Sequence, residues 1–258
     1  MPDSPLASLY SQAITSRRSL DDVMETRKAL YVGSIVTFEE ASILLKFYHQ
    51  KIPNICRAFG FPITTQLVAH QLLSHYSLSH TVSDFDLKHV MLACCYMAAK
   101  IDNVRIFLND ICSKIPKTNR SSIEDLEFVI LKALDYNISS FFSPIPCIFG
   151  LLTELGFKEI SDDFLNQIFK DLDSVYESEF FFPYSPLGIS LSLLKTRISD
   201  EQLEFLMNLV QIEETQLFDL QIQPQPLDRK RLVEIDKRII EYRIRCEDSR
   251  DKDDESNE

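Results

Sequence analysis

Glycine is scarce in this sequence, because the 258 residues include only five glycines. None belongs to a GxGxxG or GxxxxGK pattern, so the usual backbone loops that bind nucleotide phosphates are missing. Asn-Gly and Asp-Gly pairs, the strongest signals for a tight β-hairpin, are also absent, and few stretches alternate apolar and polar residues as strands do. These absences argue against kinase and dehydrogenase classes and indicate an all-α protein.

Long apolar runs and a basic surplus are missing as well. The longest apolar run, Val90 to Ala99, has ten residues, whereas a membrane-spanning helix needs about 20. The first residues contain no apolar segment typical of a signal peptide. With 39 acidic and 27 basic side chains the formal net charge is −12, which disfavours a surface that binds phosphates. We therefore expect neither a membrane nor a nucleic acid as a direct partner.

The cysteines form no CxxC pair and no dense framework of the kind that disulfide-rich domains use. A chain of this length can bury a core that is stable without disulfide bonds. We therefore expect reduced and mostly buried thiols in an intracellular protein, at Cys56, Cys94, Cys95, Cys112, Cys147 and Cys246.

Prolines divide the chain into helical segments, because proline is tolerated chiefly in the first helical turn or between helices. Two segments, Leu87–Lys100 and Leu187–Leu194, are apolar or small on nearly every side and predict the central helices of two bundles. The fold class is therefore all-α, with a diverged duplication of a five-helix unit. The expected organisation is an N-terminal helical extension over 1–36, a first domain over 37–139, a second domain over 140–222, a C-terminal helix over 223–246 and a disordered acidic tail over 247–258.

Capping residues place several helix ends. Thr37, followed by Glu40, predicts the start of the first long helix, and Pro53 predicts either a kink or a boundary in it. Ser121 and Ser122, each followed three residues later by an acid, predict the start of another helix. Further helices are expected from Thr64 or Thr65 to Leu78, from Ile106 to Ile115, near 145–155, 161–180, 185–198, 200–208 and 210–219, and from Leu227 to Cys246.

None of the titratable clusters has the spacing of a catalytic or metal site. His70, His75 and His80 are five residues apart, so consecutive rings point about 140° apart on a helix and cannot share a metal ion as an i, i+4 pair does. Cys94 and Cys95 lie in an apolar helix, where a thiol is inert. We expect no catalytic residue, no metal and no cofactor.

Clusters of one charge have structural explanations. Acid pairs such as Asp162/Asp163 and Glu213/Glu214 lie where helices start, and a helix N-terminus favours negative charge. Arg229–Arg231 fits a phosphate contact or a localisation signal, but the solvent-exposed face of the last helix is the favoured interpretation. That helix carries one narrow apolar stripe, which needs a cover, at Leu232, Ile235, Ile239 and Tyr242.

One pair of charges indicates a candidate site. Lys100 ends the first central helix, and Glu127 lies within the first two turns of the helix predicted to start at Ser121 or Ser122. Each charge is then placed where a helix dipole favours it. If these helices pack together, the two side chains can meet in a partly buried ion pair that faces whatever covers the domain there. The alternative is two unrelated surface charges.

The residues around this pair resemble the cyclin family. Met97–Asn103 is similar to the family's core signature, a hydrophobic helix that ends Leu-Ala-x-Lys-hydrophobic-acid-Glu. Glu127–Ile138 is similar to its later Glu followed by Leu-x-Phe/Tyr. Tyr176–Leu194, in which Phe182–Pro186 leads into the second central helix, resembles the second repeat of the cyclin H type. The resemblance covers residues 37–222 in helix order, with a long helix on either side.

This resemblance implies two tandem five-helix cyclin-box domains and a regulatory subunit without catalytic activity of its own. The implied partners are a cyclin-dependent kinase, which is the catalytic subunit of a CDK-activating kinase, a ring-finger assembly subunit and the core of general transcription factor IIH (TFIIH), in the nucleus. In the family, a Lys and a Glu anchor the kinase near its mobile C-helix, and hydrophobic residues pack beside them. The kinase-binding residues carried over to this sequence are Lys100, Ile101, Glu127, Leu131, Tyr136 and Ile138.

Two departures from the family pattern matter. Asn103 stands where the family usually has a Glu, which affects the local hydrogen bonding, and Thr64–Leu73 lacks the substrate-docking motif of cell-cycle cyclins, which favours a transcription-type cyclin. The alternatives are a cyclin C-like partner of another transcriptional kinase and a transcription factor IIB-like protein that binds DNA and proteins through paired cyclin domains. The latter use calls for a basic face and usually a zinc ribbon, whereas this chain is acidic and has no such cysteine cluster. An enzyme is a further alternative that no constellation of residues supports.

Overall fold

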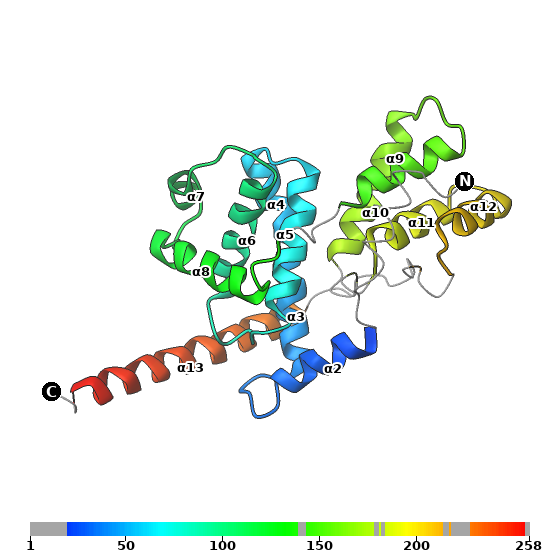
Figure 1. Ribbon diagram of the computed structural model, residues 1–258. Coiled ribbons are helices and arrows are strands. Elements are labelled where there is room, and N and C mark those ends of the chain that lie inside the picture. Colours follow the sequence, from blue (N-terminus) through cyan, green and yellow to red (C-terminus); the bar gives the residue numbers. More distant parts are fainter. Residues whose placement is uncertain are drawn as a thin grey trace.

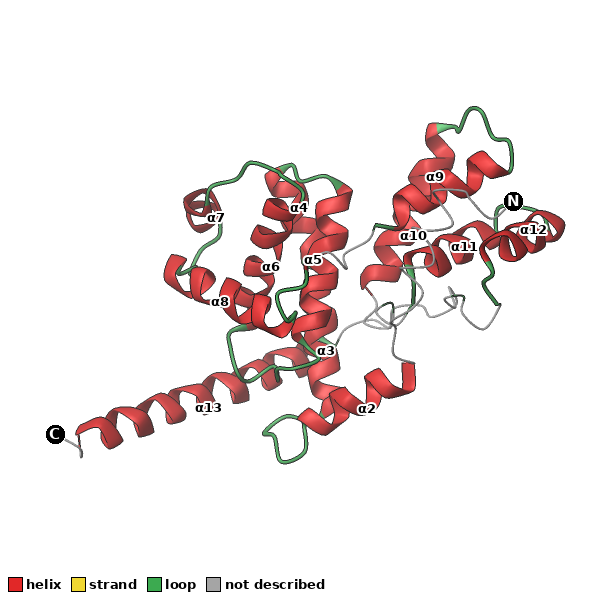
Figure 2. Cartoon of the chain, in the orientation of Figure 1, coloured by secondary structure: helices red, strands yellow, loops and turns green. Residues whose placement is uncertain are grey.

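A computed structural model of the chain describes residues 20–138, 143–177, 181, 184–213, 217 and 228–255, and for residues 20–23 and 247–255 it describes the backbone only. Every regular element in these ranges is helical, as the sequence predicts (Figure 1, Figure 2). No helix among them is both long enough and apolar enough to span a membrane. The helices are α2 (Leu20–Leu30), α3 (Phe38–His49), α4 (Ile52–Phe59), α5 (Ile63–Tyr76), α6 (Leu87–Ile101), α7 (Leu108–Lys114), α8 (Arg120–Ala133), α9 (Pro144–Glu154), α10 (Asp162–Glu177), α11 (Pro186–Lys195), α12 (Asp200–Val210) and α13 (Arg229–Glu255).

The helices form two bundles, each with its own core (Figure 1). One core collects buried side chains from α3 to α8 and from α13. The other collects them from α9 to α12, together with Leu67 of α5, Phe181 and Ile212. Two bundles flanked by α2 and α13 confirm the predicted fold class. The boundaries of the two domains, 37–139 and 140–222, stay predictions.

The two predicted central helices are α6 in the first bundle and α11 in the second. Asp86 caps α6, because its carboxylate accepts a hydrogen bond from the backbone N–H of Lys88 at 2.9 Å. Ser185 caps α11 by accepting from the backbone N–H of Gly188 at 2.9 Å, and every residue from Pro186 to Leu194 is buried. A helix that is apolar all round is therefore enclosed by other helices, as predicted.

Helix α5 is buried around its whole circumference and serves both bundles. Val68, Leu72 and Tyr76 pack into the first core, whereas Leu67 packs into the second. The sequence does not predict this shared role, because α5 carries several polar residues among its apolar ones.

Polar side chains of α5 join the two bundles. Gln66 Nε2 donates a hydrogen bond to Asp173 of α10 at 2.7 Å, and Gln71 Nε2 donates to the Tyr176 hydroxyl at 3.3 Å. A buried polar group left without a partner costs about 1–3 kcal/mol. These bonds therefore fix the position of α10 along α5.

Two predicted helix starts have different outcomes. Thr37 caps α3 in the predicted capping box, and Pro53 lies in the first turn of α4, so it marks a boundary rather than a kink. The predicted start of α8 at Ser121 or Ser122 is wrong. Asn119, an equally good cap that comes earlier in the chain, accepts from the backbone N–H of Ser121 at 3.0 Å.

Helix α13 is attached to the first bundle through one face. Arg238 forms an ion pair with Glu40 of α3 at 2.5 Å. The predicted fourth stripe residue, Tyr242, is exposed. The buried residues of this face belong to the first core, and they are Leu232, Ile235 and Ile239.

The prediction of a disordered acidic tail over 247–258 is wrong for residues 247–255, because α13 continues to Glu255. Extending an existing helix adds one hydrogen bond for each residue that is fixed, and the costly nucleation step is already complete. A charged segment can therefore continue a helix without burying apolar surface. Residues 256–258 lie outside the described residues, as do residues 139–142 at the boundary between the two predicted domains and half of the residues of the helix predicted near 210–219.

His49 of α3 and His70 of α5 form a buried pair at the junction of the bundles. Their Nδ1 atoms lie 2.9 Å apart and the rings are stacked within 5° of parallel. Tyr176 and Phe181 pack edge-on against them. Burial lowers the pKa of His49 to about 3 and the pKa of His70 well below its usual value. One Nδ1 therefore donates, the other accepts, and both rings are neutral.

The histidine pair predicts a loss of stability in mild acid. Both rings stay neutral in the folded chain but take up protons near pH 6.5 in the unfolded chain, so their stabilisation is complete above this pH and is lost as the pH falls. We expect the free energy of unfolding, measured by urea titration, to fall by about 1–3 kcal/mol from about pH 7.5 to about pH 5.5. The double variant His49→Leu/His70→Leu should lose most of this pH dependence. An unchanged dependence in that variant would contradict the assignment.

Candidate functional site

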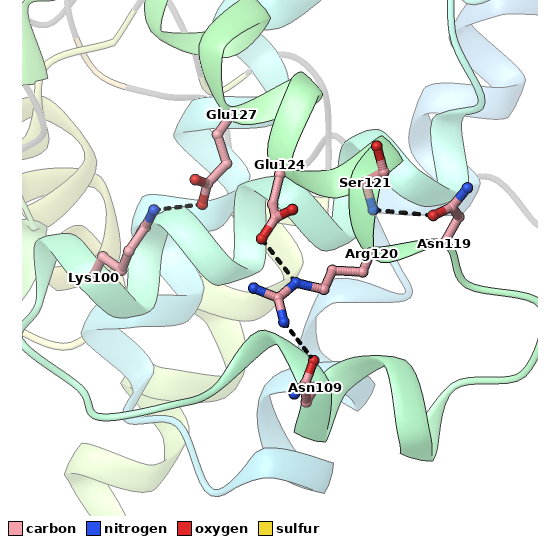
Figure 3. Close-up of polar contacts among 7 residues, drawn as sticks. All are labelled: Lys100, Asn109, Asn119, Arg120, Ser121, Glu124 and Glu127. Carbon is pink, nitrogen blue, oxygen red and sulfur yellow. Dashed lines mark hydrogen bonds and ion pairs between the residues drawn. The ribbon is translucent and has the colours of Figure 1, made fainter.

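The end of α6 meets the middle of α8 on one face of the first bundle. Lys100 Nζ lies 2.5 Å from Oε1 of Glu127, so the predicted ion pair is confirmed (Figure 3). The Glu127 side chain is 19% exposed and the Lys100 side chain is 48% exposed. The Lys100 ammonium also lies 4.5 Å from the centre of the Tyr96 ring, a cation–π distance. The pair is thus shielded on the glutamate side and open to solvent on the lysine side.

Only one of these two charges has the helix-end position that the sequence predicts. Lys100 lies in the last turn of α6, where the negative end of the helix dipole favours a cation. Glu127 is the eighth residue of α8, because that helix begins at Arg120. The dipole effect falls off within the first turn, so its predicted contribution at Glu127 is wrong. The charge of Glu127 is balanced by Lys100 instead.

A second polar network flanks the pair along α8 (Figure 3). Arg120 Nε donates to Glu124 at 2.9 Å, and Arg120 Nη1 donates to Asn109 of α7 at 3.0 Å. Arg120 and Glu124 are both about half exposed, and exposed ion pairs contribute less than about 1 kcal/mol. These contacts orient α7 beside the start of α8 but add little stability.

The chain turns sharply after Lys100, and this turn explains the asparagine that departs from the family pattern. Asn103 has a φ of 57°, a left-handed conformation that asparagine tolerates better than most residues. Its N–H donates to the carbonyl of Lys100 at 3.2 Å, and the N–H of Val104 donates to the carbonyl of Ala99 at 2.7 Å. This is the Schellman pattern of a helix end, so backbone groups supply the local hydrogen bonds. The side chain of Asp102 accepts from Thr65 of α5 at 2.7 Å and ties the turn to the core.

The end of α8 has the same construction. The N–H of Tyr136 donates to the carbonyl of Leu131 at 2.9 Å, and the N–H of Asp135 donates to the carbonyl of Lys132 at 3.0 Å. Asp135 and Tyr136 both have positive φ angles, 49° and 59°. This turn holds the Tyr136 ring in solvent, where it is 57% exposed.

The structure brings Lys100 and Glu127 together, and the other predicted kinase-binding residues lie at the end of α6, in the last turn of α8 or just after it. Ile101 and Leu131 are half-buried and pack against the first core, whereas Tyr136 and Ile138 are exposed. The predicted set does not include Phe128, which is 61% exposed and lies edge-on to Tyr136 with ring centres 6.1 Å apart. The signal was present in the sequence. Phe128 is a large apolar residue outside the apolar stripe of its helix.

Possible metal ligands, the cysteine thiols and the basic cluster on α13 were the other candidates for a functional site. In the part of the chain that the structure describes, no group of three His, Cys, Asp or Glu side chains is placed to hold a metal ion. Burial raises the pKa of the Cys94 thiol far above its usual value, and that of Cys147 to about 11. The prediction of mostly buried thiols holds only for half of the cysteines, Cys56, Cys94 and Cys95, and the other three are partly exposed. Arg229–Arg231 is exposed on α13, as predicted.

Comparison with known proteins gives a family for the first bundle. Residues 17–139 match the family profile "Cyclin, N-terminal domain". The chain is 26% identical to Cyclin-H1-1 of Arabidopsis thaliana over 131 residues, which are 50% of this chain and 38% of that protein. It is 23% identical to Cyclin CCL1 of Saccharomyces cerevisiae over 205 residues, which are 77% of this chain and 51% of that protein. The chain thus spans about half or less of the length of the curated relatives it matches.

Solved structures give the same fold. A chain in the CAK complex from Chaetomium thermophilum bound to ATP-gamma-S superposes with a TM-score of 0.64 at 12% identity, covering 83% of this chain and 76% of that one. A chain in the yeast TFIIK (Kin28/Ccl1/Tfb3) complex superposes with a TM-score of 0.63 at 18% identity, covering 89% and 96%. Residues 17–139 therefore resemble the N-terminal domain of cyclins, and the part of the chain that the structure describes has the cyclin fold. Within the family the resemblance is to cyclins of the H type.

The ion pair predicts small effects on stability, because Lys100 is half exposed and the pair can be solvated when broken. We expect Lys100→Ala to change the free energy of unfolding by less than about 1 kcal/mol. Truncating the fully buried Ile130 of the same helix pair, in Ile130→Ala, should cost about 2–5 kcal/mol. Urea titrations of both variants check this difference, and similar losses in the two would show that Lys100 belongs to the scaffold.

Proposed function

We propose that this chain is the regulatory cyclin subunit of a CDK-activating kinase of the TFIIH type. The observation that carries the proposal is the Lys100–Glu127 pair on a cyclin N-terminal domain, with exposed apolar side chains beside it. Relatives named as cyclin H and a structural neighbour from a CAK complex support the subfamily. The proposed docking surface consists of Lys100, Ile101, Glu127, Phe128, Leu131, Tyr136 and Ile138.

Such a surface has the composition of an interaction hot spot. Aromatic anchors dominate binding energies where they become fully desolvated, and Phe128 and Tyr136 are both free to be covered. The ion pair adds specificity. A partner that covers Lys100 removes the water around its ammonium group, which then depends on the Glu127 carboxylate. Net stabilisation by the pair can be close to zero, yet removing either charge from a covered pair leaves the other unpaired.

In this proposal the kinase carries out phosphoryl transfer, and the cyclin shifts its conformational equilibrium. A kinase is competent when the glutamate of its C-helix pairs with the lysine on strand β3. Moving such an equilibrium from mostly inactive to mostly active requires about 5.5 kcal/mol of differential binding. An interface of about 2,000 Å² or more with a few apolar anchors can supply this amount.

We further propose a ring-finger assembly subunit and the TFIIH core as partners, and the nucleus as the location. The yeast neighbour is a complex of three named components, Kin28, Ccl1 and Tfb3, which supports an assembly with a third subunit. That complex is the yeast TFIIK complex, which supports a place in the transcription machinery.

Removing either charge of the ion pair should weaken kinase association. We expect Lys100→Ala and Glu127→Ala each to reduce the affinity for a purified cyclin-dependent kinase of the same organism by about 100-fold or more, because a covered partner is left unpaired at a cost of about 3–5 kcal/mol. Binding is measured by surface plasmon resonance. Glu204→Ala, an exposed acid on α12 of the other bundle, is the matched control and should bind as the wild type does. Wild-type affinity in both ion-pair variants would reject the docking surface.

Phe128 should contribute an aromatic anchor to the same surface. We expect Phe128→Ala to reduce the kinase affinity by about tenfold or more, since an exposed ring that becomes buried is a typical hot spot. Phe205 of α12 is the matched control, because it is similarly exposed at 51% but lies in the second bundle. Its alanine variant should stay within about twofold of the wild type. Equal losses of kinase affinity in Phe128→Ala and Phe205→Ala would show that Phe128 is not an anchor of this surface.

A further inference from the structure

Helix α13 carries a second apolar stripe that faces solvent. Val233, Ile240 and Ile244 are 70%, 47% and 52% exposed. At 100° per residue their spacing of seven and eleven returns to within about 20° of the same direction, so they share one face. The attached face, with its last buried residue at Ile239, points elsewhere. Figure 1 shows the later part of α13 extending beyond the first bundle.

The charges of α13 run opposite to its dipole. Its first three residues, Arg229, Lys230 and Arg231, are basic, whereas 247–255 contains six acids and two bases. A helix dipole favours acids at the start and bases at the end, so this order is unfavourable in an isolated helix. Arg231 lies near Glu39 and Glu40, which it helps to keep charged. Among the described residues, the side chains of Arg229 and Lys230 have no ion-pair partner.

We propose that the exposed stripe binds a second copy of this chain, with the two α13 helices antiparallel. In an antiparallel pair the basic start of each helix lies beside the acidic end of the other, and the two dipoles are opposed. If Val233 lies beside Ile244 of the second copy, then Arg229 and Lys230 fall beside the positions of Asp248 and Glu247. The contact is isologous, so the basic start of each α13 helix meets the acidic end of the other in the same way.

The overall charge does not prevent this contact. Each copy carries a formal charge of −12, which repels a second copy at long range. At physiological ionic strength the screening length is about 8 Å, so charges in direct contact dominate over distant ones. The stripe spans about three helical turns, about 16 Å, and offers three large apolar residues, far fewer than the roughly 20–30 residues a side of a standard interface. The dimer is therefore weak and concentration-dependent.

Charge reversal tests the antiparallel arrangement. Sedimentation equilibrium of the full chain at about 0.15 M salt should show dimer forming between about 1 and 300 µM. We expect Arg229→Glu/Lys230→Glu and Glu247→Lys/Asp248→Lys each to self-associate at least tenfold more weakly. An equimolar mixture of the two variants should form heterodimers at wild-type strength, because both charged contacts are then restored. If the mixture associates no more tightly than either variant alone, the antiparallel pairing is overturned.

The apolar stripe has its own control. Ile240→Glu should abolish the dimer, while Val32→Glu, at an 85% exposed residue between α2 and α3, should leave it unchanged. Circular dichroism checks that both variants remain folded. A wild-type chain that stays monomeric over this concentration range, or a dimer that survives Ile240→Glu, would overturn the proposal. Neither outcome bears on kinase binding, which the first bundle is proposed to provide.

Discussion

A helix that is buried on every side can carry a polar side chain only where a partner meets it, and the two bundles are built around that constraint in α5. Gln66, His70 and Gln71 all meet partners near the second bundle or at its boundary. A shift of α10 by one turn would break the hydrogen bonds that Gln66 and Gln71 donate to it, and a buried polar group left without a partner costs about 1–3 kcal/mol. An apolar junction would tolerate sliding, whereas this polar one specifies a single register.

The same helix connects the junction to the candidate docking surface. Thr65 donates to Asp102, two residues beyond Lys100, and the next residue, Gln66, is bonded to Asp173 of the second bundle. Neighbouring residues thus link α10, the start of α5 and the end of α6 in one hydrogen-bonded path. The second bundle therefore supports the position of the Lys100–Glu127 pair through bonded neighbours and without contacting the pair itself.

The sequence predicts those features whose causes are local. The central helices α6 and α11 are apolar on all sides, and the cap at Thr37 acts within one turn, so both could be predicted. The role of α5 could not, because the burial of Gln66 depends on a helix about 100 residues later in the chain. The start of α8 was misplaced because Asn119 and two serines compete as caps of similar strength. The residues of the ion pair could be predicted, but Glu127 lies beyond the first turn of α8, where the helix dipole contributes little.

The strained backbone turn after α8 fixes the shape of the proposed docking surface before any partner binds. Asp135 and Tyr136 adopt left-handed conformations that cost about 1–3 kcal/mol each in residues other than glycine. Hydrogen bonds to the carbonyls of Leu131 and Lys132 compensate, and the turn presents the Tyr136 ring beside Phe128 instead of in the core. A surface already fixed in this way loses little conformational entropy when a partner covers it. A protein that shifts the conformational equilibrium of its partner by several kcal/mol needs a preformed surface. A flexible surface would adapt to the inactive conformation of the partner as readily as to the active one.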